Sequence, residues 1–252
     1  MARPTHVELA RSFDSAAAVY ANGRPGYPEQ ALDWVLPPQA SDVLDLGAGT
    51  GKLTLGLLDR GLAVTAVEPS DRMRAELETS LGSRVRAFAG RAEEIPLPDQ
   101  SVDAVLVAQA WHWVDPALAI PEVARVLRPG GRLGLLWNRR DDRVAWVSAL
   151  SEILTVPDPG ARADASQPGI APPFGPVQRC ITDGWTDMLT PQKLVDLAAC
   201  RSYVITLDED AREALLDRVR ALAAEHPDLA GREHFELPYV TECVRADLPR
   251  PA

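Results

Sequence analysis

The sequence predicts an α/β fold in which a parallel sheet carries helices on both faces. Apolar runs of strand length recur in the first part of the chain, at 42–47, 63–68, 84–89, 102–108 and 132–137. Segments of helical periodicity separate most of these runs, such as 71–81 and 116–127. A glycine-rich turn follows the first run. Strands that alternate with helices are typical of parallel sheets whose two faces are both covered.

Two helices are expected before the first strand. Thr5 and Glu8 have the spacing of a capping box, which predicts a helix that runs towards Tyr20. A link rich in glycine and proline, 22–28, then leads to a second helix that ends before Pro37.

The alternation of strands and helices stops after Val147. Residues 156–176 contain six prolines and three glycines, which predicts a long loop. A strand is expected after this loop, at 177–185, and a closing strand at 234–245.

The segment 187–230 is expected to be a helical insertion that forms a lid over the sheet edge. Thr190 can cap a helix whose first position is Pro191, and a helix at 209–225 has one apolar face. The chain is then a single domain, 1–252. Its parts are a core of 38–150, 174–186 and 232–246, an N-terminal cap of 1–37, and the lid.

The composition argues against nucleic-acid, membrane and metal partners. The net charge is −10, with −3 in residues 1–150 and −7 in 151–252, whereas a nucleic-acid enzyme is expected to have a basic face. No apolar run approaches the roughly 20 residues that span a bilayer, and no apolar signal region follows Met1. The three cysteines are far apart and near no pair of histidines with metal-ligand spacing. We expect a cytoplasmic protein, monomeric or homodimeric, with neither a disulfide framework nor a bound metal.

The most informative segment is 43–52, Val-Leu-Asp-Leu-Gly-Ala-Gly-Thr-Gly-Lys. A strand here runs into a glycine-rich turn that opens a helix, so that the backbone can approach a ligand closely. Three ligand classes compete for such a turn, and a tight turn without any ligand is the alternative.

A phosphate-binding loop requires Ser or Thr after Lys52 and glycine at position 46, but Leu53 and Leu46 stand there. A dinucleotide turn requires its third glycine where Lys52 stands, and Asp45 would repel a pyrophosphate. A ligand with a positive amino-acid end and no phosphate fits, because a carboxylate beside it is favourable.

Glu68 ends the second apolar run, 17 residues after Gly51. An acidic residue at this place can accept hydrogen bonds from both ribose hydroxyls, which indicates an adenosine-type ligand. The alternative is a solvated acid at a strand end.

Four motifs in this order resemble the class I S-adenosylmethionine-dependent methyltransferases. VLDLGAGTGKLT at 43–54 is similar to the first motif of that family, and VEPS at 67–70 to its second. Residues 90–103 resemble the loop after its third strand with the entry to the fourth, and 125–131 resemble the turn before its fifth. Within the family, the chain is similar to the type 11 small-molecule branch.

The resemblance implies a Rossmann-like fold, a mostly parallel seven-stranded sheet with an antiparallel last strand and a helical cap. It also implies S-adenosylmethionine as cofactor and in-line transfer of its methyl group to O, N or C of a small-molecule acceptor. Such a displacement depends mainly on the alignment of acceptor and methyl group.

The residues expected to bind the cofactor lie in these motifs, after the fourth strand and in the cap. They are Asp45, Gly47, Ala48, Gly49, Thr50, Gly51, Glu68, Pro69, Met73, Ala92, Glu93, Gln109, Ala110, Trp111, Tyr20 and Arg24. Many relatives carry Asp where Arg91 stands, so the contact with adenine is assigned to Ala92 and Glu93.

The segment after the fourth strand is where relatives place substrate-side and cofactor-side residues. His112 is the candidate catalytic base, since a reference pKa of about 6.5 suits proton transfer, and the alternative is a pocket wall. Trp111 and Trp113 are either neighbours of the adenine or the sulfonium, or core residues.

Tyr20 and three arginines are candidates for two further contacts. Tyr20 and Arg24 can meet the methionyl carboxylate, Arg24 through a bidentate pair, or they end a helix packed at the surface. Arg139 and Arg140 are candidate contacts of an acidic acceptor, or they belong to a solvated loop.

Two other functions stay open at this point. A nicotinamide-dependent oxidoreductase also uses an acidic residue on the ribose, but it requires the third glycine. A non-catalytic protein that binds S-adenosylmethionine would carry the same motifs and release its ligand unchanged.

Overall fold

The computed structural model describes residues 25–154 and 168–250. Contacts within the chain divide these residues into two compact units. The sheet unit contains 26–138, 168–182 and 241–250, and the helical unit contains Pro25, 139–154 and 183–240. Within the described ranges, no helix is both long and apolar enough to cross a membrane.

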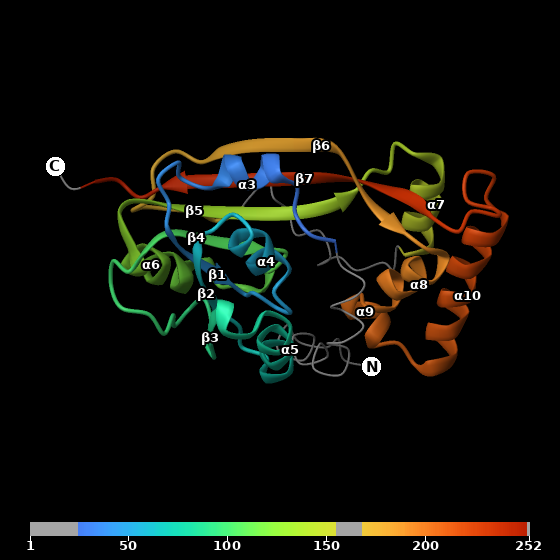
Figure 1. The fold of residues 1–252 in the computed structure, drawn as a ribbon, viewed down its shortest axis with the longest axis horizontal. Helices are drawn as coiled ribbons and strands as arrows, with labels where there is room; N and C mark the ends of the chain where they lie inside the picture. Colours follow the sequence, from blue (N-terminus) through green and yellow to red (C-terminus); the bar gives the residue numbers. More distant parts are fainter. Residues whose placement is uncertain (1–24, 155–167, 251–252) are drawn as a thin grey trace. The chain divides into compact units, whose positions relative to one another are not determined.

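Among the described residues, seven strands form one sheet in the order β3-β2-β1-β4-β5-β7-β6 (Figure 1). Their bounds are β1 Asp42–Leu46, β2 Ala63–Val67, β3 Arg86–Phe88, β4 Val102–Ala108, β5 Leu127–Arg140, β6 Gln178–Leu189 and β7 Phe235–Asp247. The first five strands in sequence are parallel. This confirms the parallel arrangement that the alternating pattern predicts.

The last strand, β7, runs antiparallel to β5. Leu248, just after β7, donates its N–H to the carbonyl of Gly131 near the start of β5, at 2.8 Å. Thr241, earlier in β7, donates its hydroxyl to the side chain of Asn138, later in β5, at 2.8 Å. Since later residues of one strand meet earlier residues of the other, the expected antiparallel last strand is confirmed.

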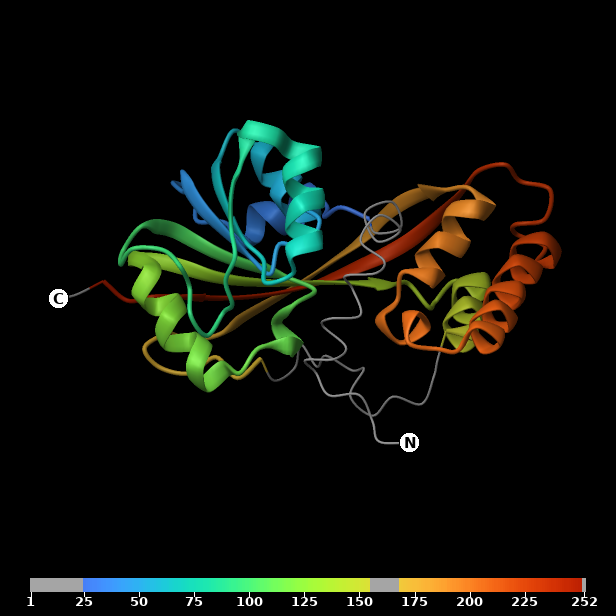
Figure 2. The same cartoon turned by 90° about the horizontal axis from the view of Figure 1, so that it is seen from below.

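Helices cover both faces of the sheet unit (Figure 2). The face shared by α3 (Glu29–Val35), α4 (Lys52–Leu58) and α5 (Asp71–Leu81) is opposite the face covered by α6 (Pro116–Val126). Buried side chains of α3 and α4 pack against β1 and β4, and those of α6 pack against β4 and β5. Burial on both faces explains why the central strands are apolar throughout rather than alternating.

The helical unit has a core of its own. It contains α7 (Ala145–Ile153), α8 (Pro191–Ala199), α9 (Ser202–Ile205) and α10 (Glu209–Glu225), and α10 contacts both α7 and α8. Leucines and valines of these helices pack with aromatic residues of β7 in one apolar cluster. The side chain of Thr190 accepts a hydrogen bond from Lys193 N–H at 3.2 Å, as the predicted cap requires.

Most elements lie where the sequence predicts them, but two strands are longer. β5 begins at Leu127, because Val102 pairs with Leu127 before the register shifts and pairing resumes at Arg132. β6 extends to Leu189. The two units also divide the chain differently from the expected core and lid, since α7 belongs to the helical unit. Its buried Trp146, Val147 and Leu150 pack in that unit's core.

The expected N-terminal helix and most of the proline-rich loop lie outside the described residues. Helices α8, α9 and α10 occupy 187–230 as predicted. That this segment covers the sheet edge stays a prediction.

Candidate functional site

Three glycines with positive φ shape the turn after β1. Gly47, Gly49 and Gly51 have φ of 74°, 57° and 88°, values that other residues rarely adopt. At Gly47 there is no room for a side chain either, since a Cβ there would lie 2.8 Å from the Cβ of Ala110. The turn after β1 therefore lies directly against the segment after β4, and Gly47 permits this close approach.

Glu68 directly follows β2 and joins two neighbouring turns. Leu46 pairs with Val67, so the glycine turn and Glu68 leave the sheet at the same edge. The Glu68 carboxylate accepts hydrogen bonds from Gly49 N–H at 2.8 Å and from Ser70 N–H at 2.9 Å. Glu68 is only 7% exposed, which excludes the alternative of a solvated acid. The carboxylate therefore links the backbone of the glycine turn to the start of α5.

Asp45, in β1 just before the turn, is 1% exposed. Its Oδ2 accepts a hydrogen bond from the Thr54 hydroxyl at 2.6 Å, while Oδ1 has no partner among the described residues. Burial raises the pKa of Asp45 to about 7; the bond from Thr54 opposes this rise and the charge of Glu68 adds to it. A buried carboxylate oxygen without a partner is costly, and a cation or an N–H group placed beside it would remove that cost.

The segment after β3 forms a closed turn. Arg91 and Glu94 pair as an isolated bridge, so Ala92 and Glu93 stand at the tip of the turn. Ala92 is buried in the apolar cluster beneath α6. The Glu93 carboxylate accepts a hydrogen bond from Asp115 N–H, just before α6, at 2.9 Å. The turn is thus held at one defined place beside the start of α6.

The backbone is strained at Gln109, the first residue after β4. Gln109 has φ of 57°, which is uncommon for a residue with a side chain. Its N–H donates to Leu136 O and its side-chain amide donates to Asn138 O, both at 2.9 Å. Asn138 in turn donates to Gly26 O at 2.8 Å. These bonds hold the segment after β4 to β5 and to the chain that leads into α3.

Trp111, His112 and Trp113 form the short 3-10 helix η3. Trp111 is buried in the cluster beneath α6, and its indole N–H donates to Pro168 O at 2.6 Å. Trp111 thus packs in the core of the sheet unit, and its contact with the cofactor stays a prediction. His112 is exposed, and its ring centroid lies 4.7 Å from that of Trp113.

Four further predicted residues divide into two groups. Met73 is buried on α5, and Pro69 is exposed between Glu68 and the cap of that helix. Tyr20 and Arg24 lie outside the described residues. The structure thus brings together the turn after β1, Glu68 and Ala110 at one sheet edge.

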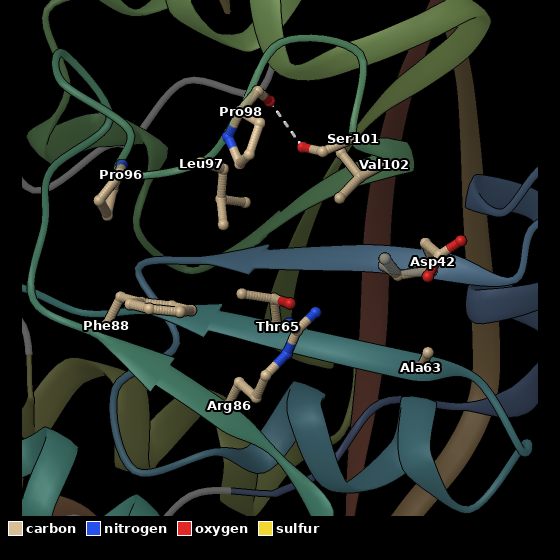
Figure 3. Close-up of a pocket in the computed structure, with 11 residues that line it drawn as sticks. Asp42, Ala63, Thr65, Arg86, Phe88, Pro96, Leu97, Pro98, Ser101 and Val102 are labelled. Atoms are coloured by element: carbon tan, nitrogen blue, oxygen red, sulfur yellow. Dashed lines mark hydrogen bonds between the residues drawn. The ribbon is translucent and has the colours of Figure 1, made fainter.

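A cavity of about 240 Å³ lies elsewhere on the sheet unit (Figure 3). It is bordered by residues of β1–β4 and of the loop before β4. These are Asp42, Val43, Ala63, Thr65, Arg86, Phe88, Pro96, Leu97, Pro98, Ser101 and Val102. None of the predicted site residues lines it. Since ligands of open α/β sheets bind outside the carboxyl ends of the strands, we place the candidate site at the glycine turn and not at this cavity.

Sequence reasoning did not single out Thr54, and it gave Asn138 no role. Thr54 bonds to Asp45 because the first turn of α4 packs back onto β1. Its signal is a lone hydroxyl among the leucines of that helix. Asn138 stands at a sheet edge with the other polar residues, but its partners are distant in sequence.

Comparisons with known proteins agree with this geometry. A family model described as a methyltransferase domain matches residues 44–135. An uncharacterised methyltransferase of Mycobacterium tuberculosis is 57% identical over 241 residues, which cover 96% of this chain and 97% of that protein. An uncharacterised methyltransferase-like protein of Schizosaccharomyces pombe is 34% identical over 242 residues, covering 92% and 93% of the two chains.

Solved structures share the fold at lower identity. A candidate type II methyltransferase of Anaeromyxobacter dehalogenans has a TM-score of 0.60 at 23% identity and covers 90% of this chain and 99% of its own. The [4+2]-cyclase SpnF has a TM-score of 0.53 at 20% identity, and the match covers 100% of this chain and 99% of the cyclase chain. Because one of these neighbours is described as a cyclase, the fold alone does not fix the reaction.

Proposed function

Because this chain belongs to the family of methyltransferases, we propose that it transfers a methyl group from S-adenosylmethionine to O, N or C of a small-molecule acceptor. S-adenosylmethionine is the cofactor that this family and the class I fold imply. The observation that carries the proposal is the bond between Glu68 and Gly49, which places a buried carboxylate beside the glycine turn.

The described residues fit the methionyl end of this cofactor. Asp45 has a buried oxygen without a partner, which suits an ammonium group, and Gly47 and Gly49 let the backbone come close. A pyrophosphate would be repelled by Glu68 and would disfavour the charged form of Asp45, whereas a cation is attracted to Glu68 and favours the charged form of Asp45. This contrast supports S-adenosylmethionine over a nicotinamide dinucleotide.

The residues on either side of the turn fit the nucleoside end. Glu68 is a buried carboxylate bonded to the glycine turn, and a carboxylate at this place can accept hydrogen bonds from the two ribose hydroxyls. Ala92 and Glu93 stand at the tip of the neighbouring turn, where we place the adenine. Met73 contributes a buried side chain from α5.

Methyl transfer from a sulfonium requires little covalent chemistry from the protein. When bound, S-adenosylmethionine supplies a methyl group on a sulfonium, whose leaving group is already good. The protein's task is to hold the acceptor in line with that methyl group, and such positioning is worth about 7–11 kcal/mol in favourable cases. If the acceptor must lose a proton, His112 is the candidate base, because it is exposed on the segment after β4.

A small-molecule acceptor is supported by charge. The chain carries −10 and its sequence has no basic run, which disfavours a nucleic-acid substrate.

A second candidate function is a protein that binds S-adenosylmethionine without transferring its methyl group, since the glycine turn, Asp45 and Glu68 would serve such a protein equally well. One experiment separates the two. The purified protein is incubated with S-adenosylmethionine carrying a labelled methyl group and with fractions of a metabolite extract. An enzyme produces S-adenosylhomocysteine and a labelled product in equal amounts with one fraction. Binding of the cofactor without turnover on any fraction would favour the non-catalytic alternative.

A further inference from the structure

Arg125, near the end of α6, uses all its donor groups on the segment that follows β3 and on its own helix. Its guanidinium donates to Ile95 O and Leu97 O, both at 2.8 Å, and to the carboxylate of Asp99 at 2.9 Å. Two further bonds of 2.8 Å go to Glu122, one turn earlier in α6. The ion pair with Glu122 raises the pKa of Arg125 and lowers that of Glu122, so both stay charged near neutral pH.

Glu122 completes this attachment from the other side. Its Oε2 accepts the N–H of Ile95 at 2.9 Å. The N–H and the carbonyl of Ile95 are thus both bonded to side chains of α6, as a strand partner would bond them. Charge-assisted hydrogen bonds of this kind are stronger than neutral ones and have defined directions.

Pro96 connects the segment held by Arg125 to the turn that contains Ala92 and Glu93. Pro96 stands between the two carbonyls that Arg125 holds, and it packs against Gly90, where a Cβ would lie 2.6 Å from Pro96 Cδ. Gly90 is the residue before the closed turn formed by Arg91 and Glu94. A shift of Pro96 would therefore shift the base of that turn.

The second half of this segment borders a cavity on one side. The cavity of about 240 Å³ lies between Pro96, Leu97 and Pro98 on one side and strands β1–β3 on the other, as Figure 3 shows. Ile95 is buried and Leu97 packs against the same apolar cluster, whereas Pro96 and Pro98 are exposed. The hydrogen bonds from Arg125 and Glu122 therefore add to the apolar contacts of Ile95 and Leu97 in holding this segment.

We propose that Arg125, paired with Glu122, is a positioning residue that holds the Ala92–Glu93 turn in the conformation that receives the adenine of S-adenosylmethionine. The proposal rests on the proposed function, since it needs the adenine at that turn. Without the arginine, the turn reaches the binding conformation only part of the time, and the observed affinity falls by that fraction.

The test compares Arg125→Ala with Arg132→Ala. Arg132 is a matched control: it bonds to the carboxylate of Asp247 and to the carbonyls of Leu36 and Trp34, far in sequence from the turn. Calorimetry with S-adenosylhomocysteine should show a dissociation constant raised roughly tenfold in Arg125→Ala, the factor expected if about one molecule in ten holds the turn correctly. It should be unchanged in Arg132→Ala, although both variants lose thermal stability.

Two readouts separate positioning from general stability. Hydrogen exchange of the ligand-free Arg125→Ala protein should be faster at the amides of 91–97 and unchanged in β1. Millimolar guanidinium should restore part of the affinity of Arg125→Ala and have no effect on Arg132→Ala. If Arg125→Ala does not fold, Arg125→Lys replaces it, because one ammonium cannot hold both carbonyls in the same geometry.

Three results would overturn the proposal. An unchanged dissociation constant in folded Arg125→Ala or Arg125→Lys shows that the turn needs no anchor. An equal loss of affinity in Arg132→Ala shows a general loss of stability. A wild-type protein that binds no S-adenosylhomocysteine refutes the proposed function itself, and with it the role in binding adenine, whatever the exchange experiment shows.

Discussion

The carboxylate of Glu68 accepts a hydrogen bond of 2.8 Å from the backbone N–H of Gly49. The acidic residue proposed to bind the ribose therefore also holds the glycine turn in place. Binding and local stability are coupled at this residue, and substitutions there must be designed to separate them.

Glu68→Ala should weaken binding of S-adenosylhomocysteine by about 1.5–3 kcal/mol, the usual value of hydrogen bonds to a charged group. It should also lower the free energy of unfolding by about 1–3 kcal/mol, because the N–H groups of Gly49 and Ser70 lose their partner. Calorimetry and urea unfolding measure the two effects. Glu68→Gln is the matched control, since it keeps the size and one acceptor. A folded Glu68→Ala protein with unaltered affinity would place the ribose elsewhere.

Gly47→Ala should lower stability by more than the strain of a positive φ alone, and it should also weaken cofactor binding. Its Cβ would lie 2.8 Å from the Cβ of Ala110, whereas a Cβ at Gly61, with φ of 78°, would have nothing within 4 Å. In both alanine variants the positive φ costs about 1–2 kcal/mol, and only Gly47→Ala adds a steric clash. Urea unfolding should therefore show a larger loss for Gly47→Ala, and calorimetry a loss of cofactor affinity in that variant alone. Equal losses in both would mean that close approach at Gly47 is unimportant.

The buried Asp45 makes stability depend on pH. Its pKa is raised from 3.8 to about 7, so between these values the folded state binds a proton that the unfolded state does not. The stability of the wild type should therefore fall, relative to Asp45→Asn, as pH rises from about 4 to 7, and stay level above that. The rise in pKa from 3.8 to about 7 corresponds to a loss of roughly 4 kcal/mol in the free energy of unfolding above pH 7.

Urea unfolding of both proteins at pH 5 and pH 8 measures this effect. The difference between Asp45→Asn and the wild type should be larger at pH 8, because the wild type then carries a buried negative charge. If the free energies of unfolding of the two proteins differ by the same amount at pH 5 and at pH 8, Asp45 is already ionised at pH 5.

His112→Ala should leave the affinity for S-adenosylhomocysteine nearly intact, since His112 is exposed and its ring lies beside Trp113. If His112 is the base, turnover with the true acceptor should fall by roughly 10²–10⁴-fold, and the loss should be smaller at high pH, where acceptors ionise unaided. Steady-state kinetics across pH measures both. Wild-type turnover in His112→Ala would remove the base assignment and leave the methyltransferase proposal untouched.

Elements with local signals were predictable from the sequence. α5 and α10 match their predicted bounds, and α8 starts where Thr190 and Pro191 predict it. The glycine turn and Glu68 were also predictable, because each follows an apolar run directly. Caps, periodicity and turn residues act over a few positions, and the sequence displays them.

Features that depend on distant partners were not predictable in the same way. The pairing that starts β5 at Leu127 depends on Val102, which lies on another strand. The hydrogen bond of the Trp111 indole depends on the carbonyl of Pro168, 57 residues later. The bonds of Arg125 depend on carbonyls of Ile95 and Leu97, about 30 residues earlier. A carbonyl group belongs to every residue, so no side-chain pattern reveals which one an arginine will hold.

The central claim is that the glycine turn, Asp45 and Glu68 form a site for S-adenosylmethionine. Calorimetry of the wild-type protein with S-adenosylmethionine, S-adenosylhomocysteine and NAD tests it most directly. The account predicts binding of both sulfur nucleosides and no comparable binding of NAD, because a pyrophosphate would meet two buried acids. Tight binding of NAD together with no signal from S-adenosylhomocysteine would contradict it.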